Sequence, residues 1–152
     1  MNESSDRVRT IRNAALVLIG GACLIQLVRP ARTNPPTDPG RTLASVTRAP
    51  VEVRSVLERA CRDCHSNDTR WPWYSNVAPV SWFVIDHVNH GRSHFNYSDW
   101  AQYKKADAEK LIKDSCEFAR DGSMPLPEYV HMHSDTRLSA EDIEALCSWV
   151  AH

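Results

Sequence analysis

The chain has 152 residues, which is enough for one modest domain with a terminal appendage. It contains 18 lysines and arginines and 19 aspartates and glutamates, but residues 1–32 hold five of the arginines and only two of the acids. The rest of the chain therefore has 13 basic and 17 acidic residues, which excludes the basic stripe of a nucleic-acid-binding protein. An acidic domain is suited instead to a partner protein with a basic docking face.

The N-terminal segment is apolar over residues 14–28 and follows Arg7, Arg9 and Arg12. This layout is typical of a secretory signal, but no small-residue cleavage site follows it. The apolar run is short against the roughly 20 residues of a spanning helix, although flanking arginines can snorkel to the membrane surface. We expect an uncleaved single-pass anchor, with lipoprotein-type cleavage before Cys23 and a buried helix of the folded domain as the alternatives.

Prolines are frequent over residues 29–49, with threonine, asparagine and glycine between them. This composition is typical of an extended linker and has no core-forming pattern. The sequence therefore predicts three parts: a signal or membrane anchor over 1–28, a proline-rich linker over 29–49 and a folded domain over 50–152.

Apolar residues recur at helical spacing in the third part of the chain, and no strand-like alternation is present. Helices are expected over residues 53–64, 80–88, 111–119 and 140–150. The second should end near Gly91, Gly122 should close the third, and Ser139 should cap the last. Two prolines make residues 124–127 non-helical. The pattern predicts an all-α domain of about four short helices.

The first of these helices leads into the pentapeptide Cys61-Arg62-Asp63-Cys64-His65. Two thiols at this spacing can bond to the two vinyl groups of haem, and the imidazole that follows can turn beneath the iron. A structural zinc site would need a second close pair of ligands, and a thioredoxin-like site would need a βαβ setting. We therefore predict one covalent haem c, with Cys61 and Cys64 as attachment sites and His65 as the proximal iron ligand.

Four segments carry a resemblance to a known family: CRDCHSNDTRWPWYSNVAPVSW, GRSHFNYSDW, MPLPEY and LSAEDIEALCSWV. Over about residues 24–150 the chain resembles the small bacterial haem-binding domain family. The resemblance implies a cytochrome c-like bundle around one covalent haem, behind an N-terminal membrane segment and outside the cytoplasm. It does not fix a partner or a reaction.

Met124 is the predicted sixth ligand of the haem iron. It lies about 60 residues after the pentapeptide in a proline-stiffened loop, a placement that resembles the methionine loop of monohaem cytochromes c. The MPLP segment also matches a motif of the family. His133 matches a position where the family has histidine and is the runner-up, Met132 and His131 also compete, and plain packing of Met124 is the remaining alternative.

Several side chains after the pentapeptide are expected to surround the haem. The aromatic ones are Trp71, Trp73, Tyr74 and Trp82. Their polar hydrogens, or the guanidinium of Arg70, can reach a haem propionate, although core packing explains the aromatic residues nearly as well. A backbone carbonyl of Pro72 or Pro79 is expected to orient His65.

Three histidines, His87, His90 and His94, have spacings of three and four residues and would share one helical face. They could form a metal site or a second haem site, but solvated or hydrogen-bonded histidines are the usual case. Gly91 lies between them and weakens the expected helix.

Cys116 and Cys147 both lie on the apolar faces of expected helices, and both match cysteines of the resembling family. In an oxidising compartment they are expected to pair as a disulfide, with two buried free thiols as the alternative.

Together, the pentapeptide and the resemblance predict a monohaem c-type cytochrome anchored in the cytoplasmic membrane, with its haem domain in the periplasm or outside the cell. It would carry single electrons between redox partner proteins rather than catalyse a reaction, although the sequence leaves enzyme activity open. The alternatives are a haem-based sensor or haem-binding module, and a small peroxidase with an open distal site.

Overall fold

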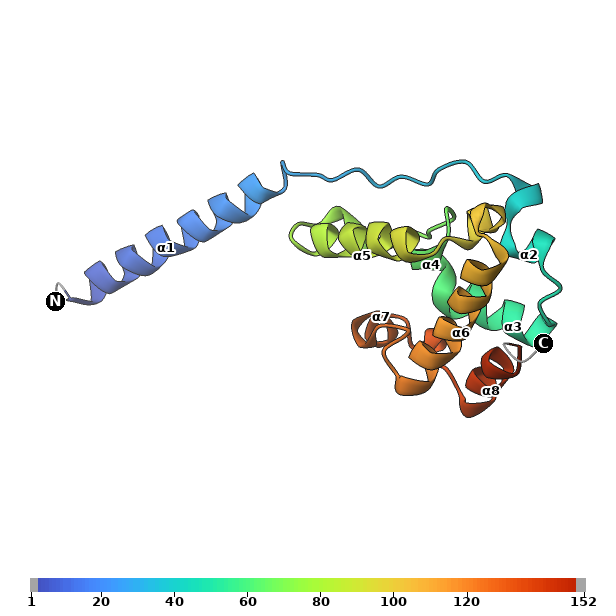
Figure 1. Ribbon diagram of the computed structural model, residues 1–152. Helices are drawn as coiled ribbons and strands as arrows, with labels where there is room; N and C mark the ends of the chain where they lie inside the picture. Colours follow the sequence, from blue (N-terminus) through green and yellow to red (C-terminus); the bar gives the residue numbers. More distant parts are fainter. Residues whose placement is uncertain (1–2, 150–152) are drawn as a thin grey trace. The chain divides into compact units, whose positions relative to one another are not determined.

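The structure, a computed structural model, describes residues 3–149 and has no β-strand in that range, so the predicted all-α fold is confirmed. Short 3₁₀ and π turns separate the α-helices (Figure 1). The α-helices are α1 (Glu3–Ile25), α2 (Leu43–Val46), α3 (Val51–Val56), α4 (Arg62–His65), α5 (Val80–His94), α6 (Lys105–Asp121), α7 (Pro127–Met132) and α8 (Ala140–Trp149). The short turns are η1 (Pro39–Arg41), η2 (Leu57–Cys61), η3 (Trp73–Asn76), η4 (Tyr97–Gln102) and η5 (Ser134–Thr136).

The chain forms two compact units. The first comprises Met1–Arg32 and Trp71–Asp86, and the second comprises Thr33–Arg70 and His87–His152, so the boundary falls inside α5. The division into anchor, linker and folded domain at residues 28 and 49 groups the chain by expected role, and it stays a prediction.

Helix α1 of the first unit begins at Glu3, well before the apolar run, and includes the three arginines that precede it. Residues Ser4–Ile25 form a helix that is long and apolar enough to cross a membrane, with a mean hydropathy of 1.5 over its apolar part and none of that part buried. This exposure argues against a buried helix of the folded domain. An apolar helix near the N-terminus could be a membrane anchor or a signal sequence.

The residues that follow α1 form hydrogen bonds with residues 71–86, the other segment of the first unit. The Gln26 side chain donates to the Ala78 carbonyl over 3.0 Å and accepts from the Ala78 N–H over 2.9 Å. The indole N–H of Trp82 donates to the Val28 carbonyl over 2.7 Å. These three bonds hold the end of the N-terminal segment against the start of α5.

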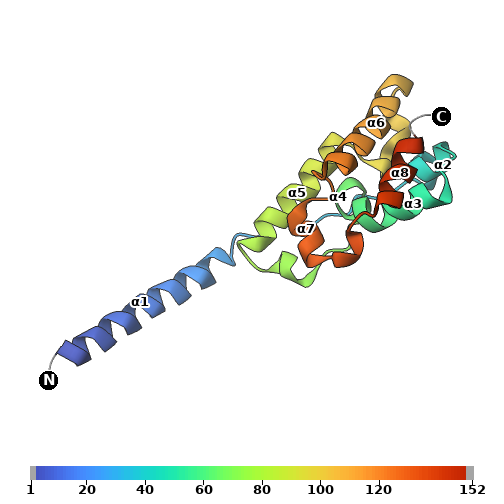
Figure 2. The ribbon, with the colours of Figure 1, turned by 90° about the horizontal axis from the view of Figure 1, so that it is seen from below.

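The core of the second unit lies among α3, α6 and α8, and α8 packs against both other helices (Figures 1 and 2). Its buried members are Leu43, Ala49, Val53, Val56, Leu57, Trp100, Ala119 and Leu146. Leu43 and Ala49 come from the proline-rich stretch, which therefore contributes to the core despite its linker-like composition. Local caps explain the helical turns in this stretch, because Asp38 accepts from the Gly40 N–H and Thr42 from the Ser45 N–H.

The ends of α6 and α8 match the signals in the sequence. Gly122 follows α6 with φ of 78°, the left-handed conformation that glycine adopts without steric cost. Before α8, the Asp142 N–H donates to Ser139 Oγ over 3.1 Å, and Asp142 Oδ2 accepts from the Ser139 N–H over 2.9 Å. This reciprocal pair is a capping box. Asp142 Oδ2 also accepts from Arg59 Nη2 over 2.7 Å, which ties α8 to the η2 turn.

Helices α6 and α8 are also linked covalently, since Cys116 and Cys147 form a disulfide with their Cα atoms 4.9 Å apart. The two residues are separated by 31 positions in the chain. The bridge therefore closes a loop that contains residues 124–127 and α7.

Removing this bridge with the pair Cys116→Ala and Cys147→Ala is expected to lower the free energy of unfolding by about 3 to 4 kcal/mol, because the unfolded chain regains the entropy of an open loop. Urea unfolding of the oxidised protein measures the change, and Cys23→Ala, which removes an exposed free thiol of α1, is the matched control. Alkylation of both Cys116 and Cys147 without prior reduction would contradict the bridge.

Candidate functional site

A cavity of about 360 Å³ lies in the second unit, with a wall that is mostly apolar. Its volume is within the roughly 300–1,000 Å³ of pockets that hold small molecules and cofactors. Cys61, Cys64 and His65 all line it. A more open groove of about 630 Å³ beside α2 and α3 contains none of these three residues. The smaller cavity is therefore the candidate binding site.

The pentapeptide lies at the end of one helical run, α3–η2–α4, in which η2 is a π turn. Leu57 and Ala60 of η2 are buried and line the cavity next to Cys61. Insertions of this kind in α-helices occur frequently at functional sites. The predicted helix over 53–64 is therefore present, with a local change of pitch at the first cysteine.

His65 is oriented by the backbone of the segment that follows α5. Its Nδ1 atom lies 3.1 Å from the Phe95 carbonyl oxygen, and the imidazole stacks on the Phe95 ring with centroids 4.5 Å apart. Burial is the main cause that lowers the pKa of His65, so the ring is held neutral. With Nδ1 donating to the carbonyl, Nε2 keeps its lone pair, as a neutral metal-ligating histidine requires.

The prediction that Pro72 or Pro79 supplies this carbonyl is wrong, because Phe95 does. Helix α5 continues past Gly91 to His94, instead of ending near Gly91, and so brings Phe95 to the imidazole. A Cβ atom at position 91 would lie 2.6 Å from the Cys64 carbonyl oxygen, which shows how closely the two backbones approach. Glycine is needed here for this contact between helices.

Gly91→Ala is therefore expected to destabilise the second unit by about 1 to 3 kcal/mol, the usual cost of overpacking. Helix propensity alone predicts the opposite sign, a gain of up to about 1 kcal/mol. Thermal or urea unfolding distinguishes the two, with Ser93→Ala at an exposed position of the same helix as the control. A stability equal to or above that of the parent would show that the contact at Cys64 is loose.

Both thiols of the pentapeptide are poor candidates for ionisation. Burial, as the largest cause, raises the pKa of Cys61 to about 12 and that of Cys64 to about 11. Thiol–disulfide exchange requires the thiolate, so neither thiol is suited to it. Among residues 3–149, no group of three or more His, Cys, Asp or Glu side chains is arranged to hold a metal ion. Within the described range, the pentapeptide therefore lacks the ligand set of a structural zinc site.

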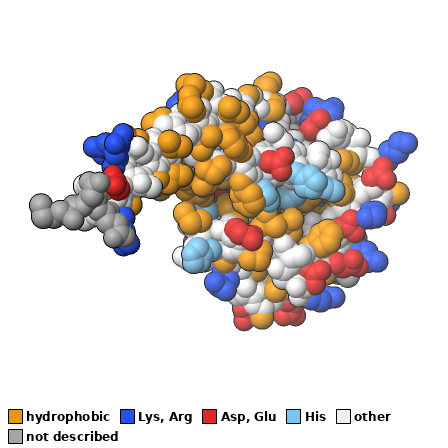
Figure 3. Space-filling view, turned by 90° about the vertical axis from the view of Figure 1, so that its left-hand side faces the viewer, with side chains coloured by type: hydrophobic (Ala, Val, Ile, Leu, Met, Phe, Trp, Pro, Cys, Tyr) orange, Lys and Arg blue, Asp and Glu red, His pale blue; other side chains and the backbone are white. Residues whose placement is uncertain are grey.

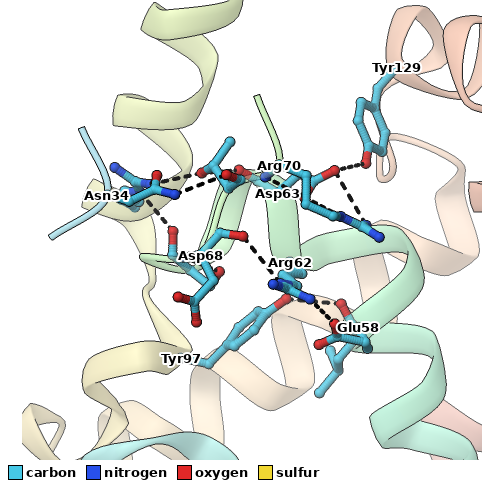
Figure 4. Close-up of polar contacts among 12 residues, drawn as sticks. Asn34, Glu58, Arg62, Asp63, Asp68, Arg70, Tyr97 and Tyr129 are labelled. Atoms are coloured by element: carbon cyan, nitrogen blue, oxygen red, sulfur yellow. Dashed lines mark hydrogen bonds and ion pairs between the residues drawn. The ribbon is translucent and has the colours of Figure 1, made fainter. Parts of the chain in front are cut away.

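Asp63, inside the pentapeptide, is buried and joins three segments (Figure 4). Its carboxylate accepts from the Arg70 backbone N–H over 3.1 Å, from Arg70 Nε over 3.0 Å and from the Tyr129 hydroxyl over 2.7 Å. Its backbone carbonyl accepts from Thr69 Oγ1 over 2.7 Å. Because Tyr129 belongs to α7 and lines the cavity, the network ties the wall that follows residues 124–127 to the pentapeptide.

Met124 lines the same cavity as His65, together with Pro125 and Leu126. Its backbone N–H donates to the Phe118 carbonyl over 3.0 Å, which fixes the start of the loop to the end of α6. The three competing ligands, Met132, His131 and His133, do not line the cavity. Of the four candidates, the structure places only Met124 on the wall that His65 shares.

The other predicted contacts of the haem are not among the residues that line this cavity. Trp71, Trp73, Tyr74 and Trp82 belong to the first unit, whereas the residues that line the cavity belong to the second. The guanidinium of Arg70 is paired with Asp63. The roles of these five residues at the haem stay predictions. The phenylalanine and tyrosine residues of the cavity wall are Phe95, Phe118 and Tyr129, none of which the sequence predicts as a contact of the haem.

His87, His90 and His94 also line the cavity, because α5 continues through Gly91 and keeps them on one face. Histidine side chains, pale blue in Figure 3, border hydrophobic side chains on one face of the molecule. The spacing of the histidines predicts this shared face. The sequence does not show the contact between Gly91 and Cys64, which explains why the helix continues through Gly91.

The model of one protein family, described as a haem-binding domain, matches residues 20–152. The chain belongs to the haem-binding domain family. The match covers the pentapeptide, all residues that line the cavity and both disulfide-linked cysteines. No curated protein and no solved structure matches the chain.

The cavity of this haem-binding domain fits its cofactor. The wall is mostly apolar, as a porphyrin requires, and the two thiols and the imidazole of the pentapeptide border the space. The imidazole is neutral and has its Nδ1 atom occupied by a carbonyl, so that Nε2 is the atom available for iron. Family membership and the chemistry of these donors therefore agree on haem binding.

Proposed function

We propose that this haem-binding domain is a membrane-tethered monohaem c-type cytochrome that carries single electrons outside the cytoplasm. The observation that carries the proposal is the shared cavity, in which His65, the two thiols of the pentapeptide and Met124 all border one space. Two axial ligands and two attachment points are the set that a closed c-type haem needs.

Each residue has a defined role in this proposal. Cys61 and Cys64 would hold the cofactor covalently, and His65 would bind its iron through Nε2 while Phe95 fixes the ring. Met124 would supply a thioether as a further iron ligand, and the mostly apolar wall would limit the access of water. When bound, the haem iron supplies a one-electron couple whose potential the axial ligands and the burial tune.

The hydropathy of α1 supports the proposed membrane anchor, and the charge of the remaining chain supports a basic partner protein. Helix α1 is apolar, exposed and close to the N-terminus, with arginines before its apolar run, and it would hold the domain at the outer face of the cytoplasmic membrane. The net acidic balance beyond residue 32 favours a redox partner protein with a basic docking face.

Potentiometric titration of the protein made with a c-type maturation system tests the electron-carrier role. The expected result is a reversible transition that follows a one-electron Nernst curve, since a single haem accepts one electron. A haem that cannot be reoxidised without an added ligand, or that turns over peroxide rapidly, would contradict the proposal and favour the sensor or the peroxidase.

Cell fractionation tests the tether. The intact chain is expected in the membrane fraction, with the second unit accessible to protease added to spheroplasts. A variant in which a cleavable signal peptide replaces residues 1–28 is expected in the soluble fraction. A mature soluble form of the parent that begins after residue 28 would refute the anchor.

A further inference from the structure

Two histidines of α5 form a hydrogen-bonded pair at the edge of the cavity. Nε2 of His90 lies 3.0 Å from Nε2 of His94, and the rings meet edge to face with centroids 4.5 Å apart. Both side chains are exposed. Within residues 3–149, neither ring makes another hydrogen bond, so the two nitrogen atoms face each other at the surface.

The backbone that carries this pair is held on several sides. Gly91 lies against the Cys64 backbone, and the carbonyl of Phe95 accepts from His65. The Arg92 guanidinium donates to the Ser66 carbonyl and to Thr69 Oγ1, each over 2.7 Å. It also donates to the carbonyl of residue 33 over 2.7 Å. The turn between the two histidines is therefore preorganised, which lowers the entropic cost of ligand binding.

The separation of the two nitrogen atoms suits a shared metal ion. Imidazole nitrogen lies about 2.0–2.1 Å from a bound divalent ion, so two nitrogens 3.0 Å apart subtend an angle of about 90° at that ion. This is the angle between neighbouring ligands in the tetragonal geometry that Cu(II) and Ni(II) prefer. Cu(II) binds most tightly among the divalent first-row ions at a given nitrogen site.

We propose that His90 and His94 bind a divalent copper ion through their Nε2 atoms, with water in the remaining positions. Two protein ligands are expected because no cluster of three or more candidate ligands occurs among the described residues. The site goes beyond the haem-binding role, since neither imidazole belongs to the proposed iron ligands. It would place a second metal ion at the wall of the cavity that His65 lines.

Copper titration of the untagged, haem-loaded protein tests the site, with Cu(II) added at neutral pH and binding followed by calorimetry. His90→Ala and His94→Ala are each expected to weaken the tightest binding by about 10-fold or more, because each removes one of two ligands. His131→Ala, at an exposed position outside the cavity, is the matched control and should leave the affinity unchanged.

Electron paramagnetic resonance of the unmodified protein with one equivalent of Cu(II) gives an independent reading that needs no variant to fold. The hyperfine pattern of two imidazole nitrogens is expected, and their loss in His90→Ala would assign them. Equal affinity in His90→Ala and the parent, or a copper signal without coupled imidazole nitrogens, would overturn the proposal.

Discussion

Protein that carries both Cys61→Ala and Cys64→Ala is expected to contain no covalently bound haem, whereas the parent retains haem after denaturation. The two thiols border the cavity and are the only attachment points that the pentapeptide offers, so removing both leaves at most a haem held by ligation and packing. Haem staining of a denaturing gel and the mass of the intact polypeptide measure the loss directly.

The control for this change is Cys23→Ala, which removes a cysteine that is exposed on α1 and distant from the pentapeptide in sequence. This variant should retain the full amount of haem. If the double variant keeps as much covalent haem as the parent, the assignment of the pentapeptide as an attachment site is wrong, whatever the protein binds by other means.

Met124→Ala is expected to convert a low-spin haem into a high-spin one, because it removes the thioether that would occupy the sixth position. The midpoint potential should fall on the order of 0.1 V or more, a part of the roughly 0.8 V over which axial ligands set haem potentials. Absorption spectra of the ferric protein and a potentiometric titration measure the two effects.

Met132→Ala is the matched control, since Met132 is exposed on α7 and does not line the cavity. It should leave both the spin state and the potential unchanged. A methionine–iron charge-transfer band at the red edge of the visible spectrum that persists in Met124→Ala, and is lost in Met132→Ala, would move the ligand to Met132.

Local chemistry made part of the fold predictable. Gly122 ends α6 because it can adopt a positive φ, and Ser139 with Asp142 starts α8 because each side chain caps the other's backbone N–H. Haem binding at the pentapeptide was equally predictable, since the residue types that it requires and their order are contained within five positions. In all of these cases the partners lie within a few residues of one another.

Contacts between segments distant in sequence were not predictable in the same way. Phe95 lies 30 positions from the imidazole that it orients, and Gly91 reads as a helix breaker until its contact with Cys64 is known. Leu43 has only Ala44, Val46 and Ala49 as apolar neighbours in the stretch, a pattern too short to indicate burial. The tryptophans are close to the pentapeptide in sequence, but closeness in sequence does not determine which residues line a cavity.

Absorption spectra of the unmodified protein in the ferric and ferrous states, with and without carbon monoxide, test the central claim of a closed electron-carrying haem most directly. With His65 and Met124 both bound to iron, the spectra should be low-spin in both oxidation states and unaffected by carbon monoxide. A high-spin ferric spectrum, or a ferrous form that binds carbon monoxide readily, would contradict the claim and favour an open site for ligand sensing or peroxide chemistry.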